Sequence, residues 1–406
     1  MKSFGFYLIC ASVTASALVS CERLDDDPQK HAVNEQYVEL SEVAHLLAEI
    51  PIQKEHLQEV HDAVSSSSGN GYDEEYTMSQ LFEAPGTGVG ETADTRSVSK
   101  YERPLRDLIQ ERLLSTKSSS GIQDSQKWLD ELTRSDIQIY WPYSDRWDGE
   151  TFPVITFDPE DDSDVNIGFR LVRDGKGAET FEEVIVDEQM AMETPVWVVN
   201  RNSDASYKTL EMLRKEDPSW GNGGGDIIVH PSSSSRASSE PRSADDSPSK
   251  CLLLKSFMAR RSYDCWFAGA SEFFVKAGSV KDFTATTEAE LKLYNPQITD
   301  FMIVVKRGQV GKTLDFNAML ISDWTEQLTH CAFMIIEDDG GTWTEWKCTA
   351  LVRIASKSYG VEFSIPVRSW DDVVWRGRLA WDWLVASSGK KNNFGDVDLT
   401  FEVMEY

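Results

Sequence analysis

The stretch CAFMIIEDDGGTWTEWKC, residues 331–348, decides the fold class of the C-terminal part of the chain. Two runs of strand length flank Asp339-Gly340, a dipeptide that favours the type I′ turn of a β-hairpin. The first run is apolar, and the second is rich in tryptophan and threonine, which are enriched in strands. The stretch therefore predicts two antiparallel strands joined by a two-residue turn.

Similar strand-like segments lie on both sides of this hairpin: FMIVV, LDFNAMLIS, YGVEFSIPV and DVDLTFEVM. Their alternation, and turn residues at fairly regular spacing, are typical of an antiparallel β-sandwich. We therefore expect a mainly β protein with a small N-terminal helical part, in which residues 251–406 form an antiparallel β-sandwich domain.

The preceding part of the chain divides into three segments. Apolar residues recur at helical spacing between residues 35 and 135, which predicts a helical segment with loops. From residue 136 the pattern changes to short strands such as PVITF and PVWVVN, so residues 136–216 are expected to form a β-rich domain. Residues 217–250 are rich in serine, proline and glycine, and this composition predicts a linker.

The N-terminus predicts a secretory signal peptide over residues 1–20. Lys2 supplies a positive charge, and residues 4–20 are uncharged, mostly apolar and rich in small residues. A membrane-spanning helix is the alternative, because the run has about the minimum spanning length of roughly 17 to 20 residues. Serine and threonine dilute the run, and small residues gather at its end, which favours cleavage.

The end of this run, Leu18-Val19-Ser20-Cys21, resembles the lipobox of bacterial lipoproteins. The resemblance covers about thirty residues. It implies a diacylglyceryl group on the Cys21 sulfur, cleavage before Cys21, and acylation of the new amino group with a chain such as palmitate. Several acyl chains, at about 0.8 kcal/mol per buried CH₂, anchor a protein stably. The expected location is the outer membrane, with the membrane as a partner through the lipid anchor.

Residues 21–34 are expected to form a lipidated acidic tether. Within it, residues 22–27 (ERLDDD) resemble the acidic surface-export signals of Bacteroidota-type lipoproteins, although Arg23 and Leu24 interrupt the acidic run. That resemblance implies exposure at the cell surface. A solvated acidic tether is the alternative, so the side of the membrane stays open.

The charge balance and the motifs exclude several function classes. Forty Lys and Arg against 68 Asp and Glu give a net charge of −28, whereas nucleic acids are bound by clustered positive charge. Residues 311–313, Gly-Lys-Thr, end a near-match to the phosphate-binding P-loop, but Lys306 stands where that loop needs glycine, and a strand is expected to follow. Nucleic acids and nucleotides are therefore not expected partners.

Four cysteines lie beyond Cys21, and an exported protein meets an oxidising compartment, so disulfides are allowed. The predicted two-residue turn places Cys331 directly opposite Cys348, at a pair whose Cα separation of about 4.5 Å permits a disulfide. Cys251 and Cys265 are the remaining candidates. Buried free thiols are the alternative for all four.

One acidic stretch resembles the start of a calcium loop, because Asp162, Asp164 and Asn166 occupy alternating positions. Ile167 stands where an EF-hand needs glycine, and Arg173 stands where it needs a bidentate glutamate. A looser calcium loop and a solvated acidic turn both stay open. No other cofactor is expected.

Two aromatic stretches, IYWPYSDRWDGE and SWDDVVWRGRLAWDW, interleave rings with charged side chains. Such a mixture can stack on a sugar or peptide and hydrogen-bond to it. The candidate ligand contacts are Trp141, Tyr143, Trp147, Trp381 and Trp383. A structural role in the β core is the alternative for each.

The sequence thus favours a non-catalytic binding or scaffolding lipoprotein of the cell envelope that recognises a glycan or a protein. The alternative is a glycan-active hydrolase, because such enzymes need only two carboxylates some 5 to 9 Å apart, and no sequence pattern reveals such a pair. No catalytic or metal-ligating residue is assigned.

Overall fold

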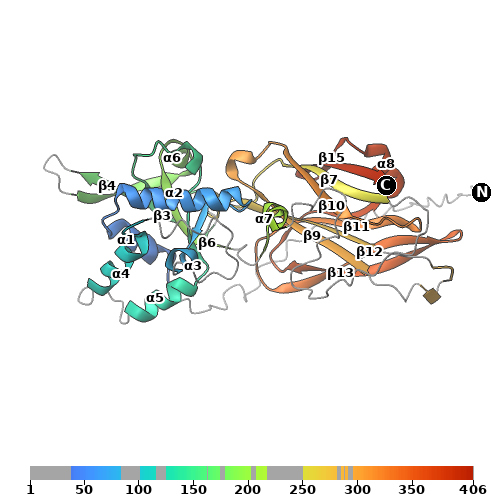
Figure 1. The fold of residues 1–406 in the computed structure, drawn as a ribbon, viewed down its shortest axis with the longest axis horizontal. Helices are drawn as coiled ribbons and strands as arrows, with labels where there is room; N and C mark the ends of the chain where they lie inside the picture. Colours follow the sequence, from blue (N-terminus) through green and yellow to red (C-terminus); the bar gives the residue numbers. More distant parts are fainter. Residues whose placement is uncertain are drawn as a thin grey trace, which may run out of the picture. The chain divides into compact units, whose positions relative to one another are not determined.

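Antiparallel sheets dominate the computed structural model of the protein, and most helices lie in its N-terminal part (Figure 1). This confirms the expected mainly β fold. The predicted signal peptide, the tether with Cys21, and linker residues 217–249 lie outside the described residues. The structure describes residues 38–83, 101–115, 125–161, 163–173, 179–202, 207–216, 250–280, 285–287, 289–290 and 296–405.

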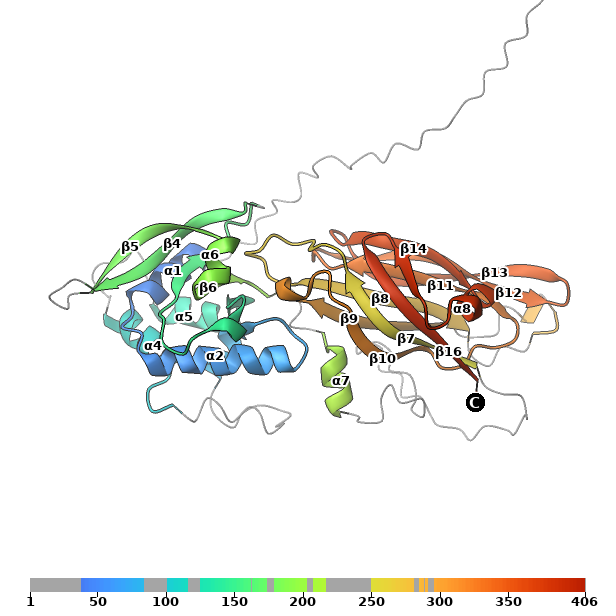
Figure 2. The same cartoon turned by 90° about the horizontal axis from the view of Figure 1, so that it is seen from above.

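The N-terminal sheet has six strands in the order β1-β2-β6-β3-β4-β5. Neighbouring strands run antiparallel, except that β3 and β6 run parallel. Figure 2 shows β4 and β5 running together as a ribbon. The strand bounds are β1 Glu75–Thr77, β2 Ile137–Tyr140, β3 Val154–Phe157, β4 Val165–Arg173, β5 Glu179–Asp187 and β6 Val196–Arg201.

Helices and this sheet share one hydrophobic core. Leu47 of α1, Leu57 of α2 and Leu108 of α4 are almost fully buried and belong to the same cluster as Trp197 of β6. The predicted helical segment and the β strands after it are therefore packed together. The helix bounds are α1 Leu40–Glu49, α2 Lys54–Gly69, α3 Met78–Phe82, α4 Leu105–Ser115, α5 Ser125–Arg134, η3 Ser144–Arg146, α6 Glu188–Glu193 and α7 Leu210–Glu216.

Two antiparallel sheets form the C-terminal part. The first has the order β10-β7-β16-β15, and the second has the order β13-β12-β11-β8-β9, with β14 also paired to β11. The bounds are β7 Lys250–Ala259, β8 Ser271–Val280, β9 Pro296–Val305, η5 Arg307–Gln309, β10 Leu314–Ile321, β11 Leu328–Glu337, β12 Trp343–Ile354, β13 Lys357–Arg368, β14 Asp372–Ala380, α8 Trp381–Ser387, β15 Lys391–Phe394 and β16 Val397–Glu405.

Aromatic side chains fill the space between these two sheets. Phe257 of β7 contacts Phe273 of β8 with ring centroids 5.1 Å apart, and Phe401 of β16 contacts Phe333 of β11 at 5.6 Å. All four side chains are fully buried, and burying each contributes about 1.5 to 3 kcal/mol. The expected antiparallel β-sandwich is confirmed.

The predicted disulfide between Cys331 and Cys348 is wrong. Cys331 lies opposite Leu379 of β14, whereas Cys348 lies opposite Phe363 of β13. The reason is that β14 occupies the edge of β11 at which the tight hairpin would have placed β12. Gly340 and Gly341 have φ values of 79° and 95° and lie in a longer turn than the predicted one. The four described cysteines, Cys251, Cys265, Cys331 and Cys348, are all free thiols.

The loop of residues 260–270, between β7 and β8, packs against the N-terminal sheet. Trp266 and Phe267 are buried in a cluster with Tyr140 and Val198 of that sheet. The Asn200 side-chain amide donates hydrogen bonds to the carbonyls of Phe267 and Ala268 at 2.9 and 2.7 Å. This loop therefore carries side chains from the sandwich onto the interior strands β2 and β6 of the N-terminal sheet.

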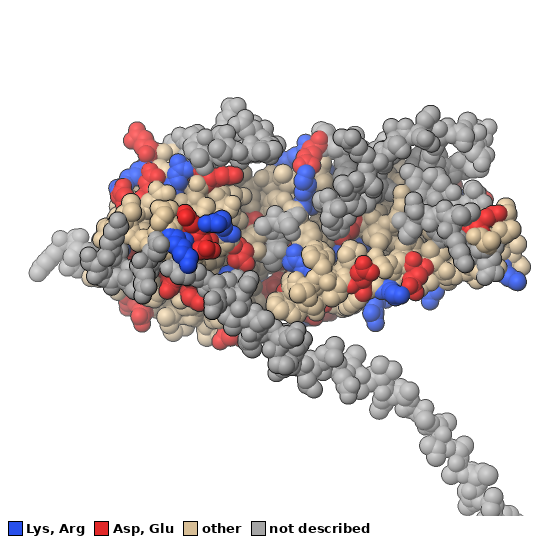
Figure 3. Space-filling view, turned by 90° about the horizontal axis from the view of Figure 1, so that it is seen from below, with Lys and Arg blue, Asp and Glu red and all other residues tan. Residues whose placement is uncertain are grey.

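The described surface carries charges of both signs, which are mixed on the face shown in Figure 3. Exposed ion pairs such as Lys347–Glu362, at 2.9 Å, occur on the strands of the sandwich. Pairs of this kind typically contribute less than about 1 kcal/mol each. Among the described residues, no helix has both the length and the hydropathy needed to cross a bilayer.

Candidate functional site

A pocket of about 190 Å³ opens where loop 260–270 meets the N-terminal sheet. We call it the acidic pocket, because its lining includes eight carboxylates and a single guanidinium, that of Arg201. Arg201 already pairs with Asp136 at 3.0 Å and Glu160 at 2.7 Å. The pocket therefore suits cations or uncharged, hydroxyl-rich ligands. Its acidic residues are Asp73, Glu75, Asp158, Glu160, Asp264, Glu272, Asp338 and Asp339.

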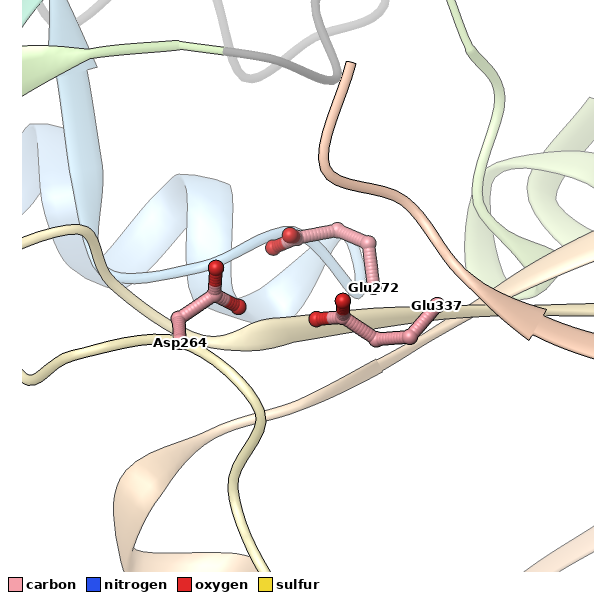
Figure 4. Close-up of side chains that lie close together, drawn as sticks. All are labelled: Asp264, Glu272 and Glu337. Atoms are coloured by element: carbon pink, nitrogen blue, oxygen red, sulfur yellow. The ribbon is translucent and has the colours of Figure 1, made fainter. Parts of the chain in front are cut away.

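Three carboxylates converge at this place, and we call Asp264, Glu272 and Glu337 the carboxylate triad. Glu272 is near the start of β8, and Glu337 ends β11 opposite Phe273, the residue that follows Glu272. Asp264 comes from loop 260–270. One oxygen of each residue lies within 4.8 Å of the others, and Figure 4 shows the three carboxylates pointing toward one another.

Glu337 is the most unusual member of the triad. Its side chain is fully buried, and neither carboxylate oxygen accepts a hydrogen bond from any described residue. Burial raises the pKa of Glu337 far above its usual range, and the neighbouring Asp264 charge raises it further. A buried carboxylate without donors is costly, so this arrangement requires either a bound proton or a cation.

Asp339, in the turn after β11, is surrounded by the same group of acidic side chains. Burial raises the pKa of Asp339 to about 7, and the charges of Asp264, Asp372, Asp371 and Asp338 add to the effect. At neutral pH, Asp339 is therefore partly protonated and able to donate as well as accept a hydrogen bond. This behaviour suits a site that faces the hydroxyl groups of a ligand.

Loop 260–270 is held in place by backbone contacts. Arg307 donates to the carbonyl oxygens of Asp264 at 2.6 Å and Gly269 at 3.1 Å. The Asp73 carboxylate accepts from the Ala270 N–H at 2.8 Å. Gly269 has a φ of 127°, and a Cβ there would lie 3.0 Å from the Asp73 carboxylate. Only glycine fits this position without displacing the carboxylate.

Aromatic side chains lie beside the turn that contains Asp338 and Asp339. Trp343 and Trp370 are 54% and 50% exposed. The Arg368 guanidinium lies 5.2 Å from the Trp343 ring centroid and equally far from that of Tyr207. Arg368 also reaches the Asp338 carboxylate at 3.4 Å. Arg368 thus links Tyr207 and Trp343 to the acidic pocket, and the Trp370 backbone N–H donates to the Gly340 carbonyl at 3.3 Å in the same turn. We call Tyr207, Trp343 and Trp370 the aromatic rim.

The N-terminal ligand candidates are mainly structural. Trp141 is 1% exposed and packs against Trp147 and Trp197 with centroids 5.3 and 5.8 Å away. The Trp147 indole N–H donates to the Thr151 carbonyl at 2.9 Å. The structure therefore brings the two rings together, with Trp141 inside the core and the half-buried Trp147 packed against it.

Tyr143 adopts a left-handed backbone conformation with φ 58°, which is rare for a residue with a side chain. The Glu74 carboxylate accepts hydrogen bonds from the backbone N–H groups of Tyr143 and Ser144, both at 3.1 Å. The Tyr143 hydroxyl donates to Glu188 at 2.9 Å. These contacts account for the conformation by local structure.

The C-terminal candidates lie on α8. Trp381 stacks on Trp324 with a centroid distance of 4.9 Å. Trp383 is 39% exposed and contacts the edge of Phe394 at 6.0 Å. Neither residue lines the acidic pocket.

The predicted calcium stretch lies elsewhere. Asp162 is outside the described residues, and the Asn166 amide is used locally, donating to the Phe157 carbonyl at 2.8 Å and accepting from the Ile167 N–H at 2.8 Å. The backbone carbonyl of the exposed Asp164 accepts a hydrogen bond from the Trp266 indole N–H at 2.8 Å. The structure instead brings together Asp264 and Glu272 with Glu337, which is distant from both in the sequence.

Comparisons with known proteins add no family to this picture: no family model matches the chain, and neither the curated proteins nor the solved structures gave a significant match. The function of the protein is therefore inferred from the geometry of the acidic pocket and the aromatic rim.

Proposed function

We propose that the protein is a lipid-anchored lipoprotein of the outer membrane that binds a glycan without cleaving it. The observation that carries the glycan proposal is the aromatic rim, in which two half-exposed tryptophans lie beside carboxylates and an arginine. Aromatic faces stack on the apolar faces of sugar rings, and carboxylates and guanidinium groups bond to sugar hydroxyls. The acidic pocket next to the rim supplies further acceptors.

A glycan-active hydrolase is the second candidate function. A glycosidase needs two carboxylates that both reach the scissile bond. Asp264 and Glu272 both line the acidic pocket, whereas Glu337 has no exposed surface. Two triad carboxylates therefore face the pocket, and analysis of the products after incubation with a glycan separates cleavage from binding.

Removing the two exposed rings of the aromatic rim is expected to weaken glycan binding strongly. The soluble ectodomain, residues 22–406, is tested against a broad glycan panel, and bound ligands are then titrated. The double variant Trp343→Ala/Trp370→Ala should weaken binding by roughly thirtyfold or more, because central tryptophans often contribute 2 kcal/mol or more to an interface. Trp383→Ala removes a similarly exposed ring on α8 and should leave the affinity unchanged.

Each result of this experiment has a definite meaning. Loss of binding in Trp383→Ala but not in the double variant would place the ligand at α8 and contradict glycan binding at the aromatic rim. Cleaved products after overnight incubation would favour the hydrolase. A panel without any bound glycan would exclude glycan recognition and leave a protein as the ligand.

The lipid anchor has its own test. Expressed in a Gram-negative host, the full chain should incorporate labelled palmitate and sediment with the outer membrane, because several acyl chains on one residue anchor stably. Cys21→Ala should remove the label and release the protein or block its processing. Cys10→Ala lies inside the apolar run and is the matched control. Unchanged labelling in Cys21→Ala would contradict the proposed attachment site.

A further inference from the structure

We propose that the carboxylate triad of Asp264, Glu272 and Glu337 binds one calcium ion. The carrying observation is Glu337, which is fully buried, points at the other two carboxylates (Figure 4), and accepts no hydrogen bond from the described residues. One Asp264 oxygen is also buried without a hydrogen-bond donor. This assignment is independent of the proposed glycan binding.

The spacing of the triad fits calcium. Calcium–oxygen distances are about 2.3 to 2.6 Å, so two ligands on opposite sides of one ion lie about 4.6 to 5.2 Å apart. One oxygen of each triad residue lies within 4.8 Å of the other two, so a small inward movement of the side chains brings all three within the coordination distance of one calcium ion. Magnesium, with distances of about 2.0 to 2.1 Å, requires a tighter arrangement.

The type of ligand atom in the triad also favours calcium. The triad consists only of carboxylates, which are hard oxygen ligands preferred by calcium, magnesium and manganese over softer metals. Up to six carboxylate oxygens are available, and calcium takes six to eight ligands. Because Asp264 and Glu272 line the acidic pocket, an ion can enter from solvent and keep water as its remaining ligands.

The protein itself supplies little positive charge to the triad. The nearby Arg307 gives its hydrogen bonds to the carbonyls of Asp264 and Gly269. None of the ion pairs among the described residues involves Asp264 or Glu337. A divalent cation would compensate the negative charges of Asp264 and Glu337.

Calcium titration of the ectodomain, residues 22–406, tests the assignment. Protein freed of metal with EDTA and desalted at pH 7.5 is titrated with CaCl₂ in a calorimeter, and its Tm is measured with CaCl₂ or MgCl₂. We expect one calcium per chain and a Tm raised by several degrees, since a ligand that binds only the folded state stabilises it. MgCl₂ at the same concentration should give a much smaller shift.

Two variants connect the response to the triad. Glu337→Gln and Asp264→Asn should each weaken calcium binding at least tenfold, and Glu337→Gln should keep the circular dichroism spectrum and the metal-free Tm, because a buried amide costs less than a buried charge. Glu345→Gln removes an exposed carboxylate from β12 and should bind calcium like the parent.

Three results would overturn the proposal. One is no saturable binding up to about 10 mM calcium, well above the dissociation constants of weak extracellular calcium modules. Another is unchanged binding in both triad variants. The third is an equal response to magnesium, which would reject calcium as the preferred ion. Loss of glycan binding alone would not affect the assignment.

Discussion

Replacing Lys276 with methionine is expected to lower the free energy of unfolding by about 3 to 5 kcal/mol, the usual cost of breaking a buried ion pair from one side. Lys276 of β8 lies directly opposite Asp300 of β9, with Nζ 2.7 Å from the carboxylate, and each side chain is only 3% exposed. Methionine keeps most of the volume of lysine. The loss therefore measures the buried charge of Asp300 and not a cavity.

The double variant Lys276→Met/Asp300→Leu separates charge from packing. Replacing a whole buried ion pair with apolar residues is often neutral or stabilising, so the double variant should recover most of the loss. Lys347→Met is the control, because Lys347 pairs with Glu362 in the same sheet at 2.9 Å but both side chains are largely exposed, and its removal should cost less than about 1 kcal/mol. Urea unfolding measures all four proteins. Equal effects of Lys276→Met and Lys347→Met would contradict this account.

The second large effect concerns the response of stability to pH. Glu59 on α2 is 3% exposed, and burial raises its pKa from 4.5 to about 7, against the hydrogen bond from the Leu105 N–H. Between these two values the folded protein holds a proton that the unfolded chain has released. The contribution of Glu59 is therefore complete below pH 4.5 and is lost as the pH rises toward 7, by roughly 3 kcal/mol in total.

Glu59→Gln is expected to remove this slope, because glutamine stays neutral like the protonated acid. The free energy of unfolding of variant and parent is measured from pH 4.5 to 7.5 in EDTA, and the difference between the two is compared. The difference is needed because His56, whose pKa burial lowers, changes stability in the opposite direction. Glu131→Gln on the exposed side of α5 is the control and should keep the slope of the parent. A slope in Glu59→Gln equal to that of the parent would show that Glu59 is ionised in the folded protein.

Local patterns in the sequence predicted the secondary structure well, because each depends on residues close together. The helical spacing before residue 135 corresponds to α1, α2, α4 and α5, and the strand-like runs after residue 300 correspond to β9 to β13 and β16. The register of β11 was not predictable in this way. Most of its edge pairs with β14, whose residues lie 35 (Glu337–Asp372) to 50 (His330–Ala380) positions later in the sequence, and this pairing is independent of the Asp339-Gly340 turn.

The candidate site could not be predicted from the sequence either, because it also depends on contacts between distant residues. Asp264, Glu272 and Glu337 come from a loop and two strands, and nothing in their spacing indicates that they meet. The acidic run at residues 337–339 was visible, but the sequence indicated only a turn. Trp141 and Trp147 were candidates because aromatic and charged residues alternate in that stretch, and this alternation does not distinguish a buried ring such as Trp141 from an exposed one.

Strands β7 and β16 lie side by side in the centre of the smaller sheet of the sandwich, with Cys251 paired to Met404. This pairing joins segments about 150 residues apart, so forming it requires closing a very long loop, which slows folding. The sandwich cannot complete its core until β16 has been synthesised. Until then β7 is an edge strand paired with β10, and the backbone edge that β16 later covers is open to any strand that comes near.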